Sequence, residues 1–288
     1  MATYQARCIK ILDYIDTHLD TDLNIDELCA YAQVSKYHFH RQCSVFFGVS
    51  LITLVRLLRL KRAAYQLAYR DDSRIIDIAL SSGYDSHEAF SRGFKKHFKQ
   101  TPSDFRQSPN WEAWQVTYAP ILHIRNQIMS DNMDYTVQTV TFPHTPIAVM
   151  VHKGAMQRLG ITIQKFIAWR KANQLPPNKS QTFNLLYDDP TATPADEFRL
   201  GLACSLPRSI DTNDTDVTVD SIPAGLCAKI RHVGSDDTIG LAVNYLYGEW
   251  LSQSDFELRD FPLFFERVRF FPEVLESEMI TDIYLPIQ

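Results

Sequence analysis

The chain has 288 residues, of which 45% are hydrophobic and 22% charged, and its acidic side chains outnumber the basic ones by five. This composition is typical of a globular protein and excludes collagen-like and disordered chains, while the length favours about two domains. The five cysteines are widely spaced without a CxxC pair, which indicates reduced thiols rather than a disulfide framework or a zinc ribbon. No apolar run reaches the ~18 residues of a membrane span and no apolar signal segment is visible, so we expect a cytoplasmic protein without a membrane partner.

Residues 1–110 are predicted to be helical throughout, because their apolar positions recur at helical spacing. A first helix is expected around Ile9–Leu19. Ser35 begins one later helix as its N-cap, and either Asp85 or Ser86 begins another. The further helices are expected at 24–32, 35–47, 50–69, 74–82 and 86–98.

Residues 111–132 are expected to link this domain to a second one at 133–288. After about residue 130 apolar and polar residues alternate, which is typical of half-buried strands. Strands are predicted at 135–142, 147–152, 197–204, 217–222, 226–233, 264–270 and 281–285, with helices at 161–169 and 241–249. The predicted fold is therefore an all-α tandem helix-turn-helix domain followed by an α+β domain built from a duplicated strand-strand-helix unit.

The net negative charge hides an uneven distribution. Residues 1–110 carry 15 bases and 12 acids, a net of +3, whereas residues 111–288 carry 14 bases and 22 acids, a net of −8. Ten of the first 15 bases lie in two runs without an acid, Ser35–Arg62 and Arg92–Lys99. Such asymmetry indicates a nucleic-acid-binding part joined to another domain.

The helical half partly repeats itself at an offset of 51 residues, which places Arg41 on Arg92. Residues 28–29 match 78–79 at an offset of 50, so the second unit has one extra residue in its turn. Each unit is a short helix, a turn and a longer basic helix, which is the layout of a helix-turn-helix. A bundle with merely solvated basic faces is the other interpretation of any one helix. Two related helices with matching arginines favour the helix-turn-helix.

The segment 78–106, IALSSGYDSHEAFSRGFKKHFKQTPSDFR, resembles the signature of the AraC/XylS transcription regulators, and LCAYAQVSKYHFHRQCSVFFGVS resembles the first unit of that family. The resemblance covers about residues 8–106. It implies that the long helix 50–69 holds two recognition helices about one turn of DNA, ~34 Å, apart, so that a monomer contacts two successive major grooves. Family members often have glycine where this chain has Lys99, which is expected to cost a few tenths to about 1 kcal/mol.

The same resemblance implies which side chains contact DNA. The base-contacting candidates are Tyr37, His40, Arg41, His87, Glu88, Ser91 and Arg92. Arg41 and Arg92 are the best candidates for bidentate contact with guanine, worth ~1–3 kcal/mol each in discrimination. The phosphate-contacting candidates, which add salt-dependent affinity, are Lys36, Lys95 and Lys96. His38 and His40 do not share a helix face, so no metal site is expected, and no cofactor is predicted.

The acidic half repeats at an offset of 80 residues, which places Pro143 on Pro223 and His152 on His232. Each half is predicted to be a strand, a second strand that ends in His-x-Gly, and a helix. A cleft between two such halves is a common ligand site. The two histidines are expected to end strands rather than to bind a ligand.

This half is similar to the GyrI-like effector-binding domain, through residues 152–154, 187–190 and the closing PLFFERVRFFPEVLESEMITDIYLPI. The order of the two domains resembles that of Rob-type regulators. The resemblance implies a cleft for bulky, aromatic or cationic compounds, with Glu266 among aromatic side chains, where cation–π contact helps to hold a cation. Strand alternation places Phe264 and Glu266 on one face, opposite Phe265 and Arg267.

The candidate effector-binding residues are Glu266, Trp169, Tyr187, Tyr245, Trp250 and Phe264. The other interpretation is that these aromatic residues are ordinary core and that Glu266 is solvated.

Together these patterns predict a sequence-specific DNA-binding transcription regulator, an activator, whose second domain binds a small hydrophobic or cationic effector. Its expected partners are double-stranded DNA, the effector and RNA polymerase. Two alternatives stay open: a GyrI-like hydrolase in which Glu266 acts with Tyr187, and a drug-sequestering protein that no longer binds DNA. The intact Arg41 and Arg92 pair counts against sequestration. No catalytic residue is assigned and no enzyme is expected, because no Gly-rich phosphate loop, GxSxG elbow or HExxH motif occurs.

Overall fold

The computed structural model describes residues 4–19, 21, 23–70, 73–130, 135–207, 216–271 and 273–288. The chain divides into two compact units, Met1–Met133 with Leu275–Ser277 and Asp134–Val274 with Glu278–Gln288. We call them the helical domain and the sheet domain. The predicted fold class is confirmed, because the first is built from helices and the second from a curled antiparallel sheet with helices.

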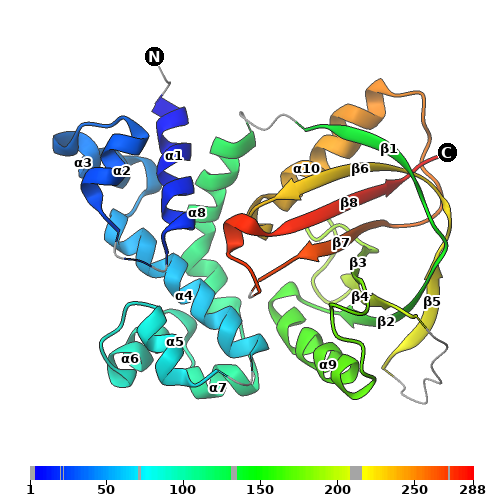
Figure 1. Ribbon diagram of the computed structural model, residues 1–288, viewed down its shortest axis with the longest axis horizontal. Helices are drawn as coiled ribbons and strands as arrows, with labels where there is room; N and C mark the ends of the chain where they lie inside the picture. The colour runs from blue at the N-terminus through cyan, green and yellow to red at the C-terminus, as the bar shows by residue number, and fades with distance from the viewer. Residues whose placement is uncertain are drawn as a thin grey trace. The chain divides into compact units, whose positions relative to one another are not determined.

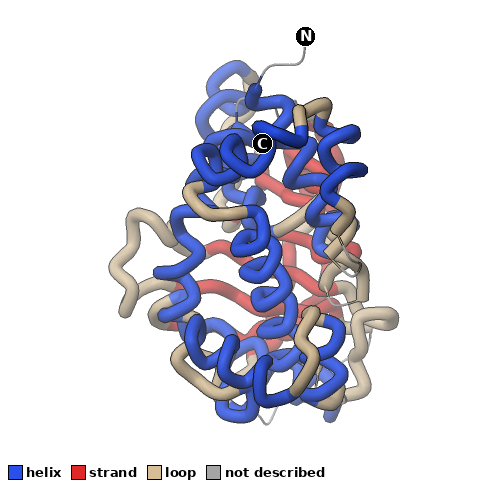
Figure 2. The backbone as a smooth tube through the Cα atoms, turned by 90° about the vertical axis from the view of Figure 1, so that its left-hand side faces the viewer, coloured by secondary structure: helices blue, strands red, loops and turns tan. Residues whose placement is uncertain are grey.

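The helical domain consists of helices joined by short turns (Figure 2), and the first six lie close to where hydrophobic spacing predicts them. Leu54, Leu60 and Ala64 of the long central helix are fully buried, so this helix forms the middle of the domain core. The helices are α1 (Tyr4–Thr17), α2 (Ile25–Ala32), α3 (Lys36–Phe47), α4 (Leu51–Tyr69), α5 (Ile75–Ser81), α6 (His87–Phe98), α7 (Pro102–Gln107) and α8 (Glu112–Ser130).

The segment 111–132 is not the linker that the sequence pattern predicts. It contains α8, and only its residues 131 and 132 lie outside the described part of the chain. Trp114 and Tyr118 are buried, and the Trp114 ring stacks on Phe98 with 4.8 Å between ring centroids. Their spacing of four residues places both on one helix face, and burial of that face attaches α8 to the core of the helical domain.

The sheet domain is one eight-stranded antiparallel sheet in the order β1-β6-β8-β7-β3-β4-β2-β5 (Figure 1). The helices α9 (Leu159–Ala172) and α10 (Ile239–Tyr245) accompany it, and a π-helical turn continues α10 to Trp250. The strands are β1 (Val137–Phe142), β2 (Thr145–Lys153), β3 (Thr182–Leu186), β4 (Arg199–Ser205), β5 (Thr218–Ile222), β6 (Gly225–Val233), β7 (Leu263–Arg269) and β8 (Ile280–Pro286).

The sheet order shows how the two sequence repeats combine. The first strand of each half pairs with the second strand of the other half, β1 with β6 and β5 with β2. The halves also meet at the centre, where β3 pairs with β7 and Phe183 lies opposite Glu266. Each predicted strand-strand-helix unit continues with two more strands, of which β3 was not predicted.

The two faces of the sheet bury different clusters. Phe265 packs with Leu246, beyond α10, whereas its neighbour Phe264 packs with Phe142 of β1 and Ile222 of β5. Neighbouring residues of a strand point to opposite faces, so Phe264 lies on the face away from the helix-side cluster. Because β1 and β5 are the two edges of the sheet, their meeting in one cluster shows that the sheet curls around this face. We call it the aromatic face; its buried residues are Phe142, Ile147, Val149, Phe183, Leu185, Ala203, Ile222, Cys227, Phe264 and Tyr284.

All five cysteines are buried and unpaired. Within the described ranges, no single helix is long and apolar enough to cross a membrane. Counted together, the bent pair of α3 and α4 has the length and apolar composition of a membrane-spanning segment. The apolar residues of α4 are mostly buried in the core of the helical domain.

Candidate functional site

The recognition helices α3 and α6 are amphipathic in the same way. In α3 the residues Phe39, Cys43 and Phe47 are buried, and they follow one another at a spacing of four. In α6 the buried positions are Phe90, Phe94 and Phe98, with the same spacing. The opposite face of each helix is therefore left to solvent, and that face holds the residues that the sequence predicts to contact DNA.

The predicted base-contacting residues lie together on these solvent faces. Tyr37 is 95% exposed in the first turn of α3, and Arg41 lies one turn later on the same face. On α6 the side chains of Glu88 and Arg92 are exposed four residues apart, whereas Ser91 is only half-buried. His40 and His87 are exposed as well. Positions near the N-terminus of such a helix are those that meet base edges in the major groove.

Ser86, rather than Asp85, begins α6. Its Oγ accepts a hydrogen bond from the backbone N–H of Ala89 at 3.2 Å. The Glu88 carboxylate lies in the first turn, where hydrogen bonds from its own backbone N–H and from the Ser86 side chain lower its pKa. A negative charge at this end complements the helix dipole, so Glu88 stabilises the helix besides being available to a base.

Not every basic side chain of the acid-free run 35–62 is available to contact DNA. Arg59 donates from Nε to the backbone oxygen of Leu19 at 3.0 Å and from Nη2 to that of Thr21 at 2.7 Å. Lys61 is buried, with its ammonium 5.2 Å from the centre of the Tyr118 ring. The run therefore overstates the charge that faces solvent, because both residues stabilise the fold.

The three predicted phosphate contacts are exposed. Lys36 lies 2.6 Å from Asp26, and that carboxylate raises the pKa of Lys36. The pair is mostly exposed, so solvent screens it and a phosphate can compete for the lysine. Lys95 and Lys96 lie in the last turn of α6, where positive charge complements the helix dipole.

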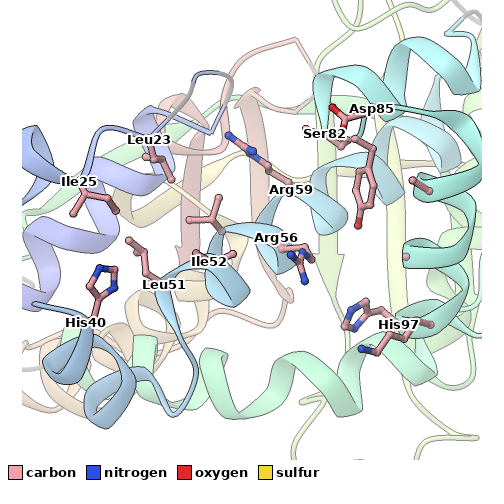
Figure 3. Close-up of a pocket in the computed structure, with 16 residues that line it drawn as sticks. Leu23, Ile25, His40, Leu51, Ile52, Arg56, Arg59, Ser82, Asp85 and His97 are labelled. Atoms are coloured by element: carbon pink, nitrogen blue, oxygen red, sulfur yellow. The ribbon is translucent and has the colours of Figure 1, made fainter.

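A groove between the two helix-turn-helix units contains residues that the sequence patterns do not single out. It has a volume of about 610 Å³, and its walls come from the start of α2, from α3, α4 and α6, and from the turn before α6 (Figure 3). Arg56, Tyr84 and His97 line it. Arg56 belongs to the acid-free run, so the charge pattern contained a signal for it. His97 carried none, because its place in the groove depends on how α6 packs on α4.

In the sheet domain, Glu266 and two of the predicted aromatic residues belong to the same face. Phe264 is fully buried in the aromatic face and Tyr187 packs against it. Glu266 is half-buried and accepts hydrogen bonds from the Tyr284 hydroxyl at 3.1 Å and from Gln181 Nε2 at 2.7 Å. The prediction that Phe264 and Glu266 share a face opposite Phe265 is confirmed.

Tyr284, which the sequence patterns do not single out, is the aromatic partner of Glu266. Its ring stacks on Phe264 with 5.0 Å between centroids and an angle of 11° between ring planes. Burial raises the pKa of its hydroxyl, and the charges of Glu266 and Asp282 raise it further. Tyr284 therefore keeps its proton and acts as a donor to the carboxylate.

A second carboxylate lies beside Glu266, since Asp282 is its direct neighbour across β7 and β8. Asp282 is buried, yet its pKa is lowered, because hydrogen bonds from Arg231 and Lys229 outweigh the opposing effect of burial. Arg231 donates to both carboxylate oxygens, at 2.7 and 2.8 Å, and Lys229 Nζ lies 2.7 Å from Oδ2. Asp282 is thus ion-paired within the sheet, whereas the hydrogen-bond partners of Glu266 are neutral groups.

Three of the residues predicted to bind the effector lie on the opposite face of the sheet from Glu266. Trp169 belongs to a cluster under α9, stacked on Phe166, and Trp250 stacks on Phe256 beside α10. Tyr245 packs on Tyr135 in that second cluster. These clusters contain Leu202 and Phe265, which face away from the aromatic face, so the sheet itself separates the three residues from Glu266.

The repeated histidines are buried structural residues. His152 Nδ1 lies 2.8 Å from Thr162 Oγ1, and its Nε2 lies 3.1 Å from the backbone oxygen of Gly154. His152 Nε2 also lies 3.2 Å from the backbone oxygen of Ala155, and His232 Nε2 makes the matching contact to that of Ser235 at 3.0 Å. Each ring joins the end of its strand to the turn that follows, as the sequence pattern predicts.

Comparison with known proteins agrees with both domains. The model of the GyrI-like small molecule binding domain matches residues 135–288, and a helix-turn-helix domain model matches residues 28–108. The probable transcriptional regulator YgiV of Escherichia coli (strain K12) is 33% identical over 157 residues, which cover 54% of this chain and 98% of YgiV. The right origin-binding protein of the same organism is 35% identical over 145 residues, or 50% of this chain and 47% of that protein.

A third relative is the uncharacterized HTH-type transcriptional regulator YbfP of Bacillus subtilis (strain 168), 38% identical over 103 residues that cover 36% of this chain and 35% of YbfP. The helical domain, the curled sheet and these relatives agree on one assignment. The chain belongs to the GyrI-like family and carries an AraC-type helix-turn-helix domain in front of its GyrI-like domain.

Proposed function

We propose that this transcriptional regulator binds specific DNA sequences through α3 and α6 and that an effector on the aromatic face of the sheet domain controls its activity. One observation supports DNA binding most strongly. Two helices bury residues at the same spacing of four, Phe39, Cys43 and Phe47 in α3 and Phe90, Phe94 and Phe98 in α6, and each has exposed arginine, histidine and other polar side chains on the opposite face. These residue types form the specific contacts to base edges in the major groove.

Within this proposal Arg41 and Arg92 contact guanine in two half-sites, and Tyr37, His40, His87, Glu88 and Ser91 contact neighbouring bases. Lys36, Lys95 and Lys96 contact phosphates and add the salt-dependent part of the affinity. The protein acts as a cytoplasmic activator with RNA polymerase as its partner at the promoter. The names of two relatives, the probable transcriptional regulator YgiV and the HTH-type transcriptional regulator YbfP, support the role in transcription.

The DNA assignment is tested by selecting bound duplexes from a random library with the full chain and repeating the selection with variants. Arg92→Ala is expected to relax base preference in one half-site and weaken binding to the selected site by about 1–3 kcal/mol, and Arg41→Ala to do the same in the other half-site. Arg158→Ala removes an equally exposed arginine from the sheet domain and serves as the control. Unchanged preference in both variants would remove the two arginines from the contact set.

The effector is a hydrophobic, aromatic compound with a cationic group. The aromatic face supplies stacked rings, and Glu266 is the carboxylate there that is hydrogen-bonded to neutral groups. Cation–π contact adds to the attraction of a cation when both are removed from water. The sheet domain is a binding module rather than a catalyst in this proposal, in line with the names of YgiV and YbfP as transcriptional regulators.

The effector proposal is tested by titrating the full chain with a benzyl quaternary ammonium compound and with its neutral carbon isostere. Glu266→Gln is expected to weaken the cation by about tenfold or more and to leave the isostere within about twofold, the range of one lost charge interaction. Glu249→Gln changes a carboxylate on the helix side and is the matched control. Equal weakening of both ligands would make Glu266 a structural residue.

A further inference from the structure

The groove between the recognition helices is the feature of the helical domain that the proposed function has not used. In Figure 3 the side chain of Arg56 and the ring of His97 reach into the same end of the groove, while His40 lies at its other end. The groove therefore opens between the two surfaces that are proposed to enter successive major grooves. A DNA strand that connects two major grooves must pass this place with its phosphates.

The groups at the Arg56 end are predominantly positive. Lys96 lines the groove beside His97, and Lys99 lies three residues further on. Arg59 also lines it, but its guanidinium is engaged by backbone oxygens of the α1–α2 turn. The carboxylate that lines the groove is Asp85, which lies in the turn before α6 and away from His97 in Figure 3.

Tyr84 shapes this end of the groove. Gly93 on α6 leaves room for it, because a Cβ at that position would lie 2.6 Å from the Tyr84 hydroxyl. The ring packs edge-on against Phe90. Its hydroxyl is buried without a hydrogen-bond partner among the residues that the structure describes. The charge of Arg56 acts on this hydroxyl, so Tyr84 holds an unused donor near that guanidinium.

The positive charges around His97 disfavour protonation of its ring. Burial lowers the pKa of its ring, and the charges of Lys96, Arg56 and Lys99 lower it further. The ring is therefore mainly neutral near pH 7 in the free protein, since even its ordinary pKa is about 6.5. The charges that act on it are all positive, so an anion placed among them favours the protonated ring.

We propose that Arg56, Lys96 and His97 form a seat for one DNA phosphate between the recognition helices, and that His97 takes up a proton when this phosphate binds. This inference rests on the proposed DNA binding and adds a regulatory property to it. The affinity for DNA increases as the pH falls, because the complex holds the proton more tightly than the free protein does. The increase ends below the pKa of the free ring, where both states are protonated.

The probe is a fluorescent duplex of 30 base pairs with mixed sequence, since phosphate contacts do not require a particular operator. Its dissociation constant is measured between pH 5.5 and 8 at constant ionic strength. The wild-type chain is expected to gain about 3- to 10-fold more affinity over this range than His97→Gln, because a tenfold gain corresponds to a rise of about 1 in the pKa of the ring on binding. His40→Gln and His87→Gln remove exposed histidines of the recognition helices and report how much of the pH effect those residues supply.

A second measurement follows the His97 ring itself by NMR in the folded full chain. Its pKa is expected to rise on addition of the duplex, and to rise in the free Arg56→Gln variant, because that substitution removes a repelling charge. Inorganic phosphate alone is the comparison ligand, and it should move the ring far less than the duplex does. An equal shift by inorganic phosphate would identify a general anion site and overturn the DNA seat.

The two proposals fail in different ways. If the wild-type chain binds neither the mixed-sequence duplex nor any duplex of the random library, DNA binding itself is wrong. If the duplex binds with the same pH dependence in the wild type and in His97→Gln, and the ring pKa does not move, DNA binding stands and the proton-linked seat is wrong. Unfolding temperatures of all variants, compared with the wild type, identify any variant whose weak binding reflects a damaged fold.

Discussion

The two helix-turn-helix units share one plan and differ at the ends of their recognition helices. In the first unit, Ser35 precedes α3 without a side-chain hydrogen bond to the backbone, and the first helical residue is Lys36. In the second unit, Ser86 caps α6, Glu88 lies in the first turn, and basic residues fill the last turn. The charges of α6 therefore complement the helix dipole, whereas Lys36 opposes it in α3.

The turns of the two units show where the extra residue lies. The Val34 N–H donates to the backbone oxygen of Cys29 at 3.0 Å, and the Tyr84 N–H donates to that of Ala79 at 3.1 Å. These bonds are equivalent at an offset of 50 residues, while the helices that follow are equivalent at 51. The inserted residue is thus Asp85, which lies between the matched bond and the N-cap of α6.

The comparison teaches that the second recognition helix is specified locally and the first by its core. The charges and the cap of α6 favour a helix even before it packs. The start of α3 lacks a side-chain cap bond and a complementary charge, so its stability depends more on burial of Phe39, Cys43 and Phe47. Substitutions at matched positions separate these two contributions.

The largest effects on stability are expected at the buried phenylalanines that occupy matched positions in the two units. Phe39→Ala and Phe90→Ala each remove a fully buried phenylalanine, and each is expected to cost about 3–5 kcal/mol of the free energy of unfolding. Hydrogen exchange of the α4 amides measures the loss within the helical domain alone. Val45→Ala, at a mostly exposed position of α3, is the control with an expected effect near zero. A loss at Phe39 well below that at Phe90 would contradict a first unit that depends on its core.

A smaller effect is expected from the N-caps, and there the units should differ. Ser86→Ala removes the bond to the Ala89 N–H and is expected to destabilise α6 by about 1 kcal/mol. Ser35→Ala should cost only a few tenths of a kcal/mol, because its side chain makes no cap bond. Exchange rates of the amides in the first turn of each helix provide the measurement. Equal losses in the two helices would show that Ser35 caps α3 in solution.

The smallest effects are expected at the C-terminal ends, where Gly48 and Lys99 occupy matched positions. Both adopt the left-handed conformation, with φ of 67° and 58°. Lys99→Gly should therefore stabilise the helical domain by a few tenths to about 1 kcal/mol, as the sequence resemblance predicts. Gly48→Ala should destabilise it by about 1 kcal/mol. Thermal unfolding of both variants tests the pair, and a stabilising Gly48→Ala would contradict the shared backbone conformation.

Sequence reasoning predicted the elements well wherever apolar spacing repeats. It missed β3, because Thr182–Leu186 is short and contains Asn184 at a position that a strand pattern disfavours. It also treated α8 as a linker, although Trp114, Tyr118 and Ile121 are spaced for one helix face. This spacing is a helix signal that the sequence alone contains.

The candidate sites were predictable to different extents. The solvent faces of α3 and α6 follow from the helical period once the buried residues are identified, so the sequence alone places the candidate DNA-contacting residues on α3 and α6. The effector residues did not follow in the same way. Strand alternation correctly separates Phe264 from Phe265, but no local rule relates Trp169 or Trp250 to either face.

The amino-acid sequence by itself determined the helices and most of the strands, the two internal repeats, the domain order and the family, because each depends on spacing along the chain. The tertiary structure alone decided which basic side chains make contacts within the protein, as Arg59 and Lys61 do, and which aromatic residues lie near Glu266. It also decided that Arg56 and His97 share a groove. The physical reason is that spacing along the chain determines on which face of a helix or strand a side chain lies. Packing between distant segments determines which residues that face contacts.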